Sequence, residues 1–149
     1  MERLKRLKRL QLSPGVLRLI RSARIAHLAT ADAGNQPHVI PICFVFDGKC
    51  FYSPIDEKPK RTAPRNLRRV RNIVENPQAS LVIDRYDEDW GRLAYALISG
   101  KARIVSQGEK HAKAVRLLRR KYRQYRSMAI HERPMIVIRP TRLLTWGRP

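Results

Sequence analysis

Acidic residues are scarce in this sequence. Only 12 Asp and Glu face 32 Lys and Arg in 149 residues, which gives a formal net charge of +20. This excess predicts attraction to phosphates, nucleic acid or anionic membranes, and it says nothing about the fold. Long apolar runs are missing as well: the sequence has neither the ~20 apolar residues of a membrane span nor the apolar core of a secretory signal. We therefore expect a cytoplasmic protein.

Metal and nucleophile motifs are missing too. The 2 cysteines and 4 histidines show no zinc-ligand spacing. We find no Gly-rich phosphate loop, nucleophile elbow or pair of catalytic carboxylates. The acidic run over 84–89 lacks the spacing and central Gly of a calcium loop, and pairing with Arg85 and Arg92 accounts for it. We predict no metal site and no catalytic side chain.

What is present is a strand-rich pattern that predicts one domain over residues 1–149. Helical spacing begins in a basic arm over 1–22, where Ser13 and Pro14 resemble an N-cap and a first helical residue. Two further helices are expected, one from a Thr62 N-cap to Asn76 and one over 107–125. Strand-like segments cover 24–30, 37–46, 49–53, 79–86, 92–105 (bent or broken at Ser99-Gly100), 135–138 and 143–146.

These segments predict a mainly β (α+β) fold: a six-stranded antiparallel β-barrel with an N-terminal helical arm and two inserted helices. Asp47-Gly48 favours a two-residue hairpin turn that places Phe46 opposite Lys49. Cys43 and Cys50 would then be diagonal neighbours, poorly placed for a disulfide and therefore reduced. Pro41 marks a bulge or a sheet edge.

Positive charge is concentrated in residues 1–24, 58–71 and 110–126, which hold 23 of the 32 Lys and Arg. The middle segment passes from a strand end into the first turns of a helix, where free N–H groups already favour anions. It is either a phosphate seat or a solvated basic face. In 110–126 most charges can lie opposite the apolar stripe of an ordinary surface helix.

The order of these parts resembles the flavin/deazaflavin split-barrel superfamily, which includes pyridoxamine 5′-phosphate oxidase, and within it the probable F420-dependent subfamily. The resemblance covers residues 23–147. It rests on the strands at 26–30 and 36–44, and on the helix at 69–77 leading into the strand at 79–84. The most specific stretch is Asp84-Arg85-Tyr86-Asp87-Glu88-Asp89-Trp90, followed by Leu93 and Gly100-Lys101-Ala102-Arg103.

The resemblance implies a six-stranded split barrel, a homodimer and F420 or FMN as cofactor at the subunit interface. It also implies that hydride chemistry belongs to the cofactor, with transfer to a small unidentified substrate. His38 would either contact cofactor or substrate or be structural. The residues implied to bind the cofactor are the ring-side strand positions Pro41, Ile42, Cys43 and Phe44 and the phosphate-binding positions Lys58, Lys60, Arg69 and Asn72.

Two alternatives stay open at this point. One is a basic barrel that binds nucleic acid, which the charge favours, although aromatics are only 7% of residues and most fall in strand-core patterns. The other is a split barrel that carries a flavin or F420 without turnover.

Overall fold

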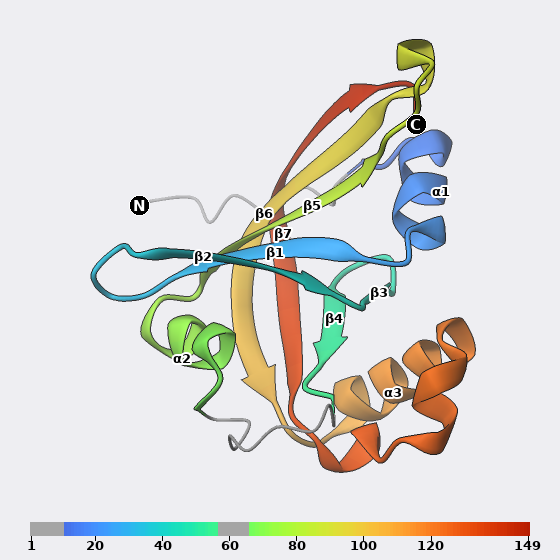
Figure 1. Ribbon diagram of the computed structural model, residues 1–149. Helices are drawn as coiled ribbons and strands as arrows, with labels where there is room; N and C mark the ends of the chain where they lie inside the picture. Colours follow the sequence, from blue (N-terminus) through green and yellow to red (C-terminus); the bar gives the residue numbers. More distant parts are fainter. Residues whose placement is uncertain (1–10, 57–65) are drawn as a thin grey trace, which may run out of the picture.

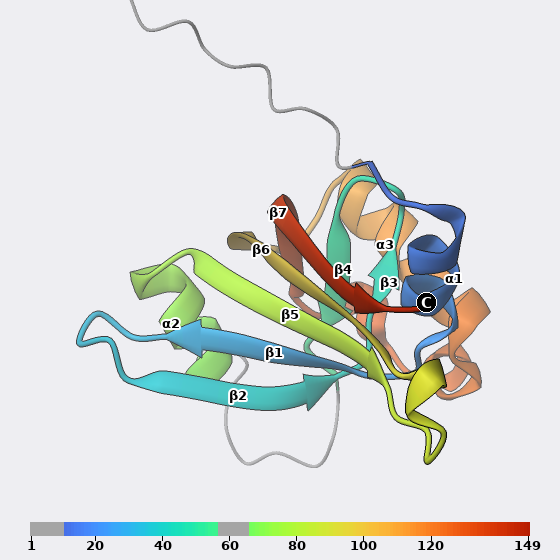
Figure 2. The ribbon, with the colours of Figure 1, turned by 90° about the horizontal axis from the view of Figure 1, so that it is seen from above.

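Seven antiparallel strands form one curled sheet in the computed structural model, which describes residues 11–56 and 66–149 (Figures 1 and 2). The strand order is β2-β1-β5-β6-β7-β4-β3. The strands are β1 (Ala26–Ala31), β2 (Pro37–Ile42), β3 (Val45–Phe46), β4 (Phe51–Pro54), β5 (Gln78–Arg85), β6 (Ala94–Val105) and β7 (Met135–Gly147). The mainly β class is confirmed, and the predicted count of six strands is corrected to seven.

The limits of the strands differ as well, because the apolar run over 37–46 is not one strand. It breaks at Cys43 and Phe44, so β2 ends at one edge of the sheet and β3 begins at the other. Pro41 therefore lies on an edge strand, as predicted. The runs at 135–138 and 143–146, by contrast, belong to the single strand β7.

The hairpin after Phe46 has a longer loop than predicted. Phe46 pairs with Phe51 rather than Lys49, and Val45 pairs with Tyr52. The physical reason is the Asp47 carboxylate, which accepts hydrogen bonds from the backbone N–H groups of Lys49 (2.8 Å) and Cys50 (2.7 Å). This side-chain cap stabilises a four-residue loop, which overrides the two-residue turn that Asp-Gly favours. Both cysteines are free thiols.

Three α-helices pack on this sheet: α1 (Pro14–Ser22), α2 (Arg68–Glu75) and α3 (Glu109–Lys121). The Ser13 cap of α1 is confirmed by its side chain, which accepts from the Val16 N–H at 3.2 Å. However, α1 buries its apolar face in the core and is not a free arm. The two inserted helices are confirmed as α2 and α3, although α2 begins at Arg68. The predicted Thr62 cap, the helical spacing over 2–10, and Lys58 and Lys60 lie outside the described residues.

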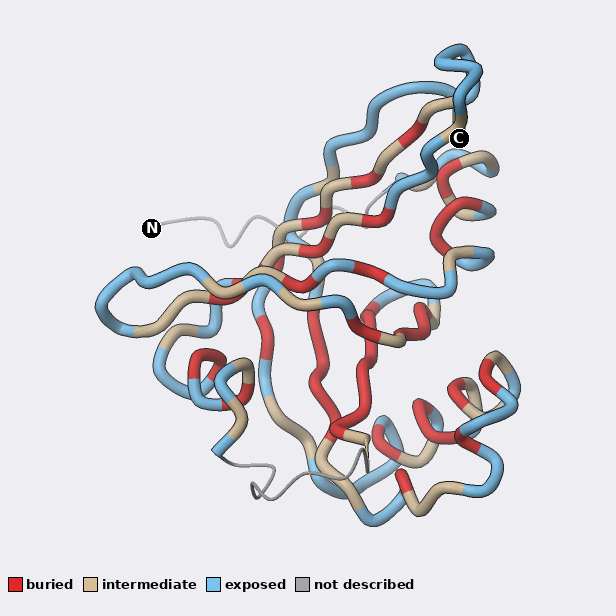
Figure 3. The backbone as a smooth tube through the Cα atoms, in the orientation of Figure 1, coloured by how far each residue is buried: buried red, intermediate tan, exposed pale blue. Residues whose placement is uncertain are grey.

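Two apolar cores lie on the two faces of the sheet (Figure 3). The inner core is formed by the concave face and is covered by α1 and α2. The second core lies outside β3, β4 and β7, under α3 and the short 3₁₀ helices Arg123–Ser127 and Ile130–Glu132. Because α3 covers only this part, no helix of residues 11–56 and 66–149 lies over the outer face of β5, β6 and the far half of β7.

The predicted irregularity at Ser99-Gly100 is confirmed. Register against β7 shifts there, since Ser99 pairs with Arg142 and Gly100 with Pro140, leaving Thr141 as the extra residue of a bulge. A side chain at Gly100 would overlap the carbonyl oxygen of Arg139. The glycine therefore permits the close approach that the bulge needs.

We expect Gly100→Ala to lower the free energy of unfolding by about 1–3 kcal/mol, because β7 must shift away from the new methyl group. Gly34→Ala is the control, since its added carbon meets only the Asp32 side chain at 3.4 Å. Urea denaturation of both variants measures the difference. Equal stability of the two would contradict the close approach.

Candidate functional site

One recess in the described structure gathers several of the predicted cofactor-binding residues. It has a volume of about 250 Å³ and lies between the ends of β2 and β4 and the first turn of α2. Its lining residues are Ile25, Pro41, Ile42, Cys43, Ser53, Pro54, Asp56 and Arg69. We call it the Arg69 recess.

The structure brings Pro41, Ile42, Cys43 and Arg69 together in this recess. Phe44, predicted beside them, is fully buried in the inner core. Asn72 is also buried, and its amide donates to the Thr30 hydroxyl at 3.1 Å. His38 pairs across the strands with that same Thr30. His38 and Asn72 are therefore neighbours of Thr30 and do not line the recess.

Arg69 is the cation of the recess. Burial lowers the pKa of its guanidinium, while Asp56 and Tyr125 act in the opposite direction. The Tyr125 hydroxyl donates to Asp56 Oδ2 at 3.3 Å, and burial raises the pKa of this tyrosine. The Nε of Arg69 is buried and has no hydrogen-bond partner among the described residues. A buried guanidinium N–H without a partner is suited to an anionic ligand group.

The wall of the recess is held in place by a set of hydrogen bonds at the break between β2 and β3. The Tyr122 hydroxyl accepts from the Phe44 N–H at 3.0 Å and donates to the Arg24 carbonyl at 2.9 Å. Ser53 Oγ donates to the Cys43 carbonyl at 2.8 Å. Backbone groups that leave the sheet ladder are thus satisfied by side chains.

Lys121 completes this arrangement from the end of α3. Its Nζ donates to the Phe44 carbonyl at 3.0 Å and lies 3.9 Å from the centroid of the Phe44 ring. Burial, followed by the nearby Arg24 charge, lowers the pKa of Lys121 to about 8. The ammonium is therefore a structural contact that holds Phe44 against α3.

Sequence reasoning missed the recess residues Ile25, Ser53, Pro54 and Asp56, and also the supporting residues Lys121, Tyr122 and Tyr125. The apolar spacing of 107–125 placed Tyr122 and Tyr125 on a helix face, but it could not show that their hydroxyls reach residues 43–56. No periodic signal marks Asp56, which follows the end of a strand.

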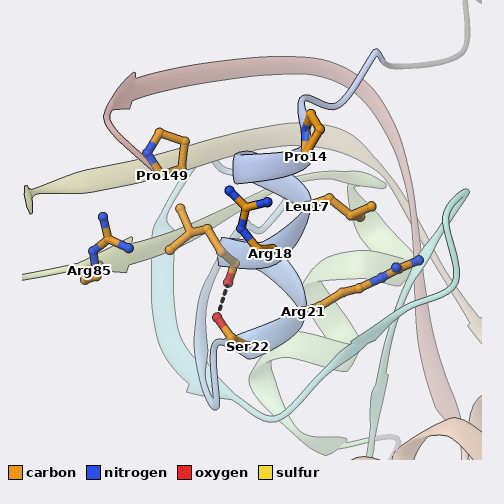
Figure 4. A pocket seen from close by; sticks show the side chains of 8 residues that line it. Pro14, Leu17, Arg18, Arg21, Ser22, Arg85 and Pro149 are labelled. Carbon is orange, nitrogen blue, oxygen red and sulfur yellow. Dashed lines mark hydrogen bonds between the residues drawn. The ribbon is translucent and has the colours of Figure 1, made fainter.

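A larger hollow of about 770 Å³ lies between α1 and the C-terminal segment (Figure 4). Arg18, Arg21 and Arg85 line it among apolar side chains. The Arg85 guanidinium is occupied there, because it donates to the carbonyls of Arg92 (2.9 Å) and Arg148 (2.6 Å). None of the predicted site residues lies in this hollow.

The acidic loop and the possible metal and membrane sites considered from the sequence can also be compared with the structure. Asp87 pairs with Arg92 at 3.4 Å, as predicted for the acidic loop. Residues 11–56 and 66–149 contain no group of three or more His, Cys, Asp or Glu placed to hold a metal ion. No helix in those ranges has the length and apolar character needed to span a bilayer.

Comparison with known proteins gives one family match. A sequence model of the family described as pyridoxamine 5′-phosphate oxidase matches residues 12–147. No curated protein sequence matches the chain significantly.

Solved structures share the fold at low sequence identity. Conserved hypothetical protein Rv2991 from Mycobacterium tuberculosis is 18% identical, with a TM-score of 0.73 over 94% of this chain and 88% of that one. The heme storage protein HutZ from Vibrio cholerae is 16% identical, with a TM-score of 0.72 over 93% and 96%. A protein described as F420 reductase is 21% identical, with a TM-score of 0.61 over 90% and 98%.

The Tyr122 hydroxyl generates a testable expectation. Tyr122→Phe leaves the Phe44 N–H buried without a partner, so we expect the free energy of unfolding to fall by about 1–3 kcal/mol. Tyr86→Phe is the control, because Tyr86 is 67% exposed and its hydroxyl reaches only Glu88 at 3.4 Å. Urea denaturation at neutral pH measures both, and a Tyr122→Phe protein as stable as wild type would rule out this role.

Proposed function

The chain belongs to the pyridoxamine 5′-phosphate oxidase family, and we propose that it is an oxidoreductase that binds F420 or FMN at the Arg69 recess. The observation that carries the proposal is the buried Arg69 Nε, which has no partner among the described residues, in a recess lined by the strand end Pro41, Ile42 and Cys43. A guanidinium is a strong phosphate ligand, and both cofactors carry a phosphate.

The strand end beside Arg69 suits the edge of a planar ring. β2 is hydrogen-bonded only to β1 and forms one edge of the sheet. Edge strands present unpaired N–H and C=O groups, which can bind the polar edge of a flavin or deazaflavin without a dedicated side chain. This supports the backbone contacts that the family resemblance implies for residues 41–43.

The chain's part in the reaction is binding and orientation. The cofactor, when bound, supplies hydride or electron transfer. The negative charge of Asp56 favours the charged form of the Arg69 guanidinium, and the hydrogen bonds at the break between β2 and β3 fix the strand end. The substrate is then selected by the space left above the ring.

The relatives described as F420 reductase and heme storage protein make heme the competing ligand. No histidine lines the Arg69 recess among the described residues, and Cys43 is its only soft donor. Arg69 Nε, which has no partner among the described residues, suits a phosphate-bearing ligand, so F420 and FMN are favoured over heme.

A second copy of the chain would complete this site. The recess, at about 250 Å³, is smaller than the ~300–1,000 Å³ of pockets that bury a whole small ligand. The uncovered outer face of the sheet carries a row of apolar residues, with the Tyr95 and Trp146 rings stacked at 5.9 Å and Val39 61% exposed. Leu97 and Leu144 are paired in the same row. We propose that this row of apolar residues forms a homodimer interface, as the family resemblance implies.

The cofactor proposal predicts that Arg69→Gln weakens F420 or FMN binding by roughly 10- to 100-fold, since a charge-assisted contact contributes about 1.5–3 kcal/mol. Titration of nucleic-acid-free protein, followed by absorbance and fluorescence quenching, measures the affinity. F420, FMN and hemin are compared in parallel.

Arg71→Gln is the matched control, because Arg71 is an exposed arginine on the same helix. If Arg69→Gln lowers the melting temperature, Arg69→Lys, which keeps the charge, replaces it in the affinity measurement. Unchanged affinity in both Arg69 variants would refute the phosphate role. Saturation by hemin alone would refute the cofactor class.

The dimer proposal predicts that Leu144→Arg with Trp146→Arg converts a dimer to a monomer, because four charges per dimer would be buried in an apolar interface. Light scattering coupled to size exclusion measures the mass. Val74→Arg is the control, since Val74 is 74% exposed on α2. A monomeric wild-type protein would count against the interface.

A further inference from the structure

A second recess lies on the outer face of β6 and β7, beside the start of α3. It has a volume of about 200 Å³ and is lined by Cys50, Lys101, Ala102, Arg103, Lys110, Val137 and Arg139. Four of these seven residues are cations, and they come from three different elements. We call it the β6–β7 basic recess. It shares no lining residue with the Arg69 recess.

We propose that the β6–β7 basic recess binds an oligophosphate group. The side chains of its cations are all exposed, and none of them forms an ion pair or hydrogen bond with another described residue. The acidic residues of the neighbouring elements are used elsewhere: Glu109 pairs with Arg116 at 3.2 Å, and Asp47 with Lys113 at 3.6 Å. Positive charge therefore gathers here without internal compensation.

The strand register places two of these cations directly opposite each other. Lys101 pairs with Arg139 across β6 and β7, and Arg103 lies on the same face two residues further along. Like charges at directly opposite sheet positions destabilise the pair. A bound polyanion would offset this repulsion, because each cation would then lie beside negative charge.

The start of α3 adds to the preference for an anion. Lys110 lies in the first turn of α3, and the N-cap residue is Gly108, which provides no side-chain cap. The first N–H groups of the helix and its partial positive charge are then left to favour nearby negative charge.

The size of the recess decides the class of ligand. A volume of about 200 Å³ is too small for a whole nucleotide or cofactor, and it suits a compact group with several charges. Arg103 and Arg139 supply planar forks that match phosphate oxygens, and the two lysines supply point charges. A single strand of nucleic acid would need stacking aromatics between the cations, and none lines this recess.

The test is calorimetric titration of the full chain with tripolyphosphate and, separately, with ATP, both at fixed ionic strength. We expect one site per chain, and a double variant, Lys101→Gln with Arg139→Gln, that binds roughly tenfold or more weakly. Arg120→Gln with Arg123→Gln removes the same charge from exposed positions beyond the recess, and we expect less than a roughly threefold change there. Binding of both ligands would show that the phosphates alone are recognised, whereas binding of ATP but not tripolyphosphate would contradict an oligophosphate site.

A stability measurement separates lost binding from lost folding. Because Lys101 and Arg139 repel each other, the double variant should melt at the same temperature as wild type or higher. Lys110→Gln, which leaves the sheet unchanged, should also weaken tripolyphosphate binding. It replaces the double variant in the titration if the double variant does not fold.

Several outcomes would overturn the proposal. Equal weakening in the two double variants would mean that only net charge matters. Loss of tripolyphosphate binding in Arg69→Gln, with normal binding in the Lys101 and Arg139 variant, would move the ligand to the Arg69 recess. Saturable binding of a single-stranded oligonucleotide but not of tripolyphosphate would show a nucleic-acid surface instead.

Discussion

The break at Cys43 and Phe44 is the constraint on which the arrangement depends. Here the chain leaves β2 at one edge of the sheet and enters β3 at the other, so its backbone groups lose their ladder partners. Tyr122, Lys121 and Ser53 replace those partners from α3 and β4. The same bonds fix the strand end that lines the Arg69 recess. The link between β2 and β3 and the candidate site therefore depend on the same contacts. A change that displaces α3 should also displace the residues that line the recess.

Local patterns predicted the elements well and their partners poorly. Alternating apolar residues identified the strands, and Ser13-Pro14 identified the start of α1. The apolar run over 37–46 gave no sign of its break, because Cys43 and Phe44 are as apolar as their neighbours. What ends β2 is a tyrosine 78 positions away in the chain. The hairpin register failed for a related reason: Asp47 caps its own loop, and the dipeptide preference alone does not include that bond.

The family resemblance pointed to some residues of the recess, and whether they bind a cofactor stays a prediction. Pro41, Ile42, Cys43 and Arg69 line the recess, whereas Asn72, one helical turn beyond Arg69, is directed to Thr30 in the interior. One turn of α2 thus separates a position that lines the recess from a position in the core. Asp56 and Tyr125 could not be inferred, since their contact joins residues 69 positions apart.

The cations that give the chain its large positive charge do not all have the same role. The chain has only 12 acidic residues. Several arginines therefore donate hydrogen bonds to backbone carbonyls and do not pair with carboxylates. Arg24 donates to the Lys121 carbonyl at the end of α3, and Arg119 donates to the carbonyls of Tyr125 and Met128. Such bonds satisfy the C-terminal ends of helices, where cations are favoured. Cations used in this way need no ligand. Those of the two recesses differ because the bonds that would occupy them are missing among the described residues, so charge density alone does not locate a binding site. The two proposed sites rest instead on Arg69 Nε, which is buried without a partner among the described residues, and on Lys101 and Arg139, which lie directly opposite each other.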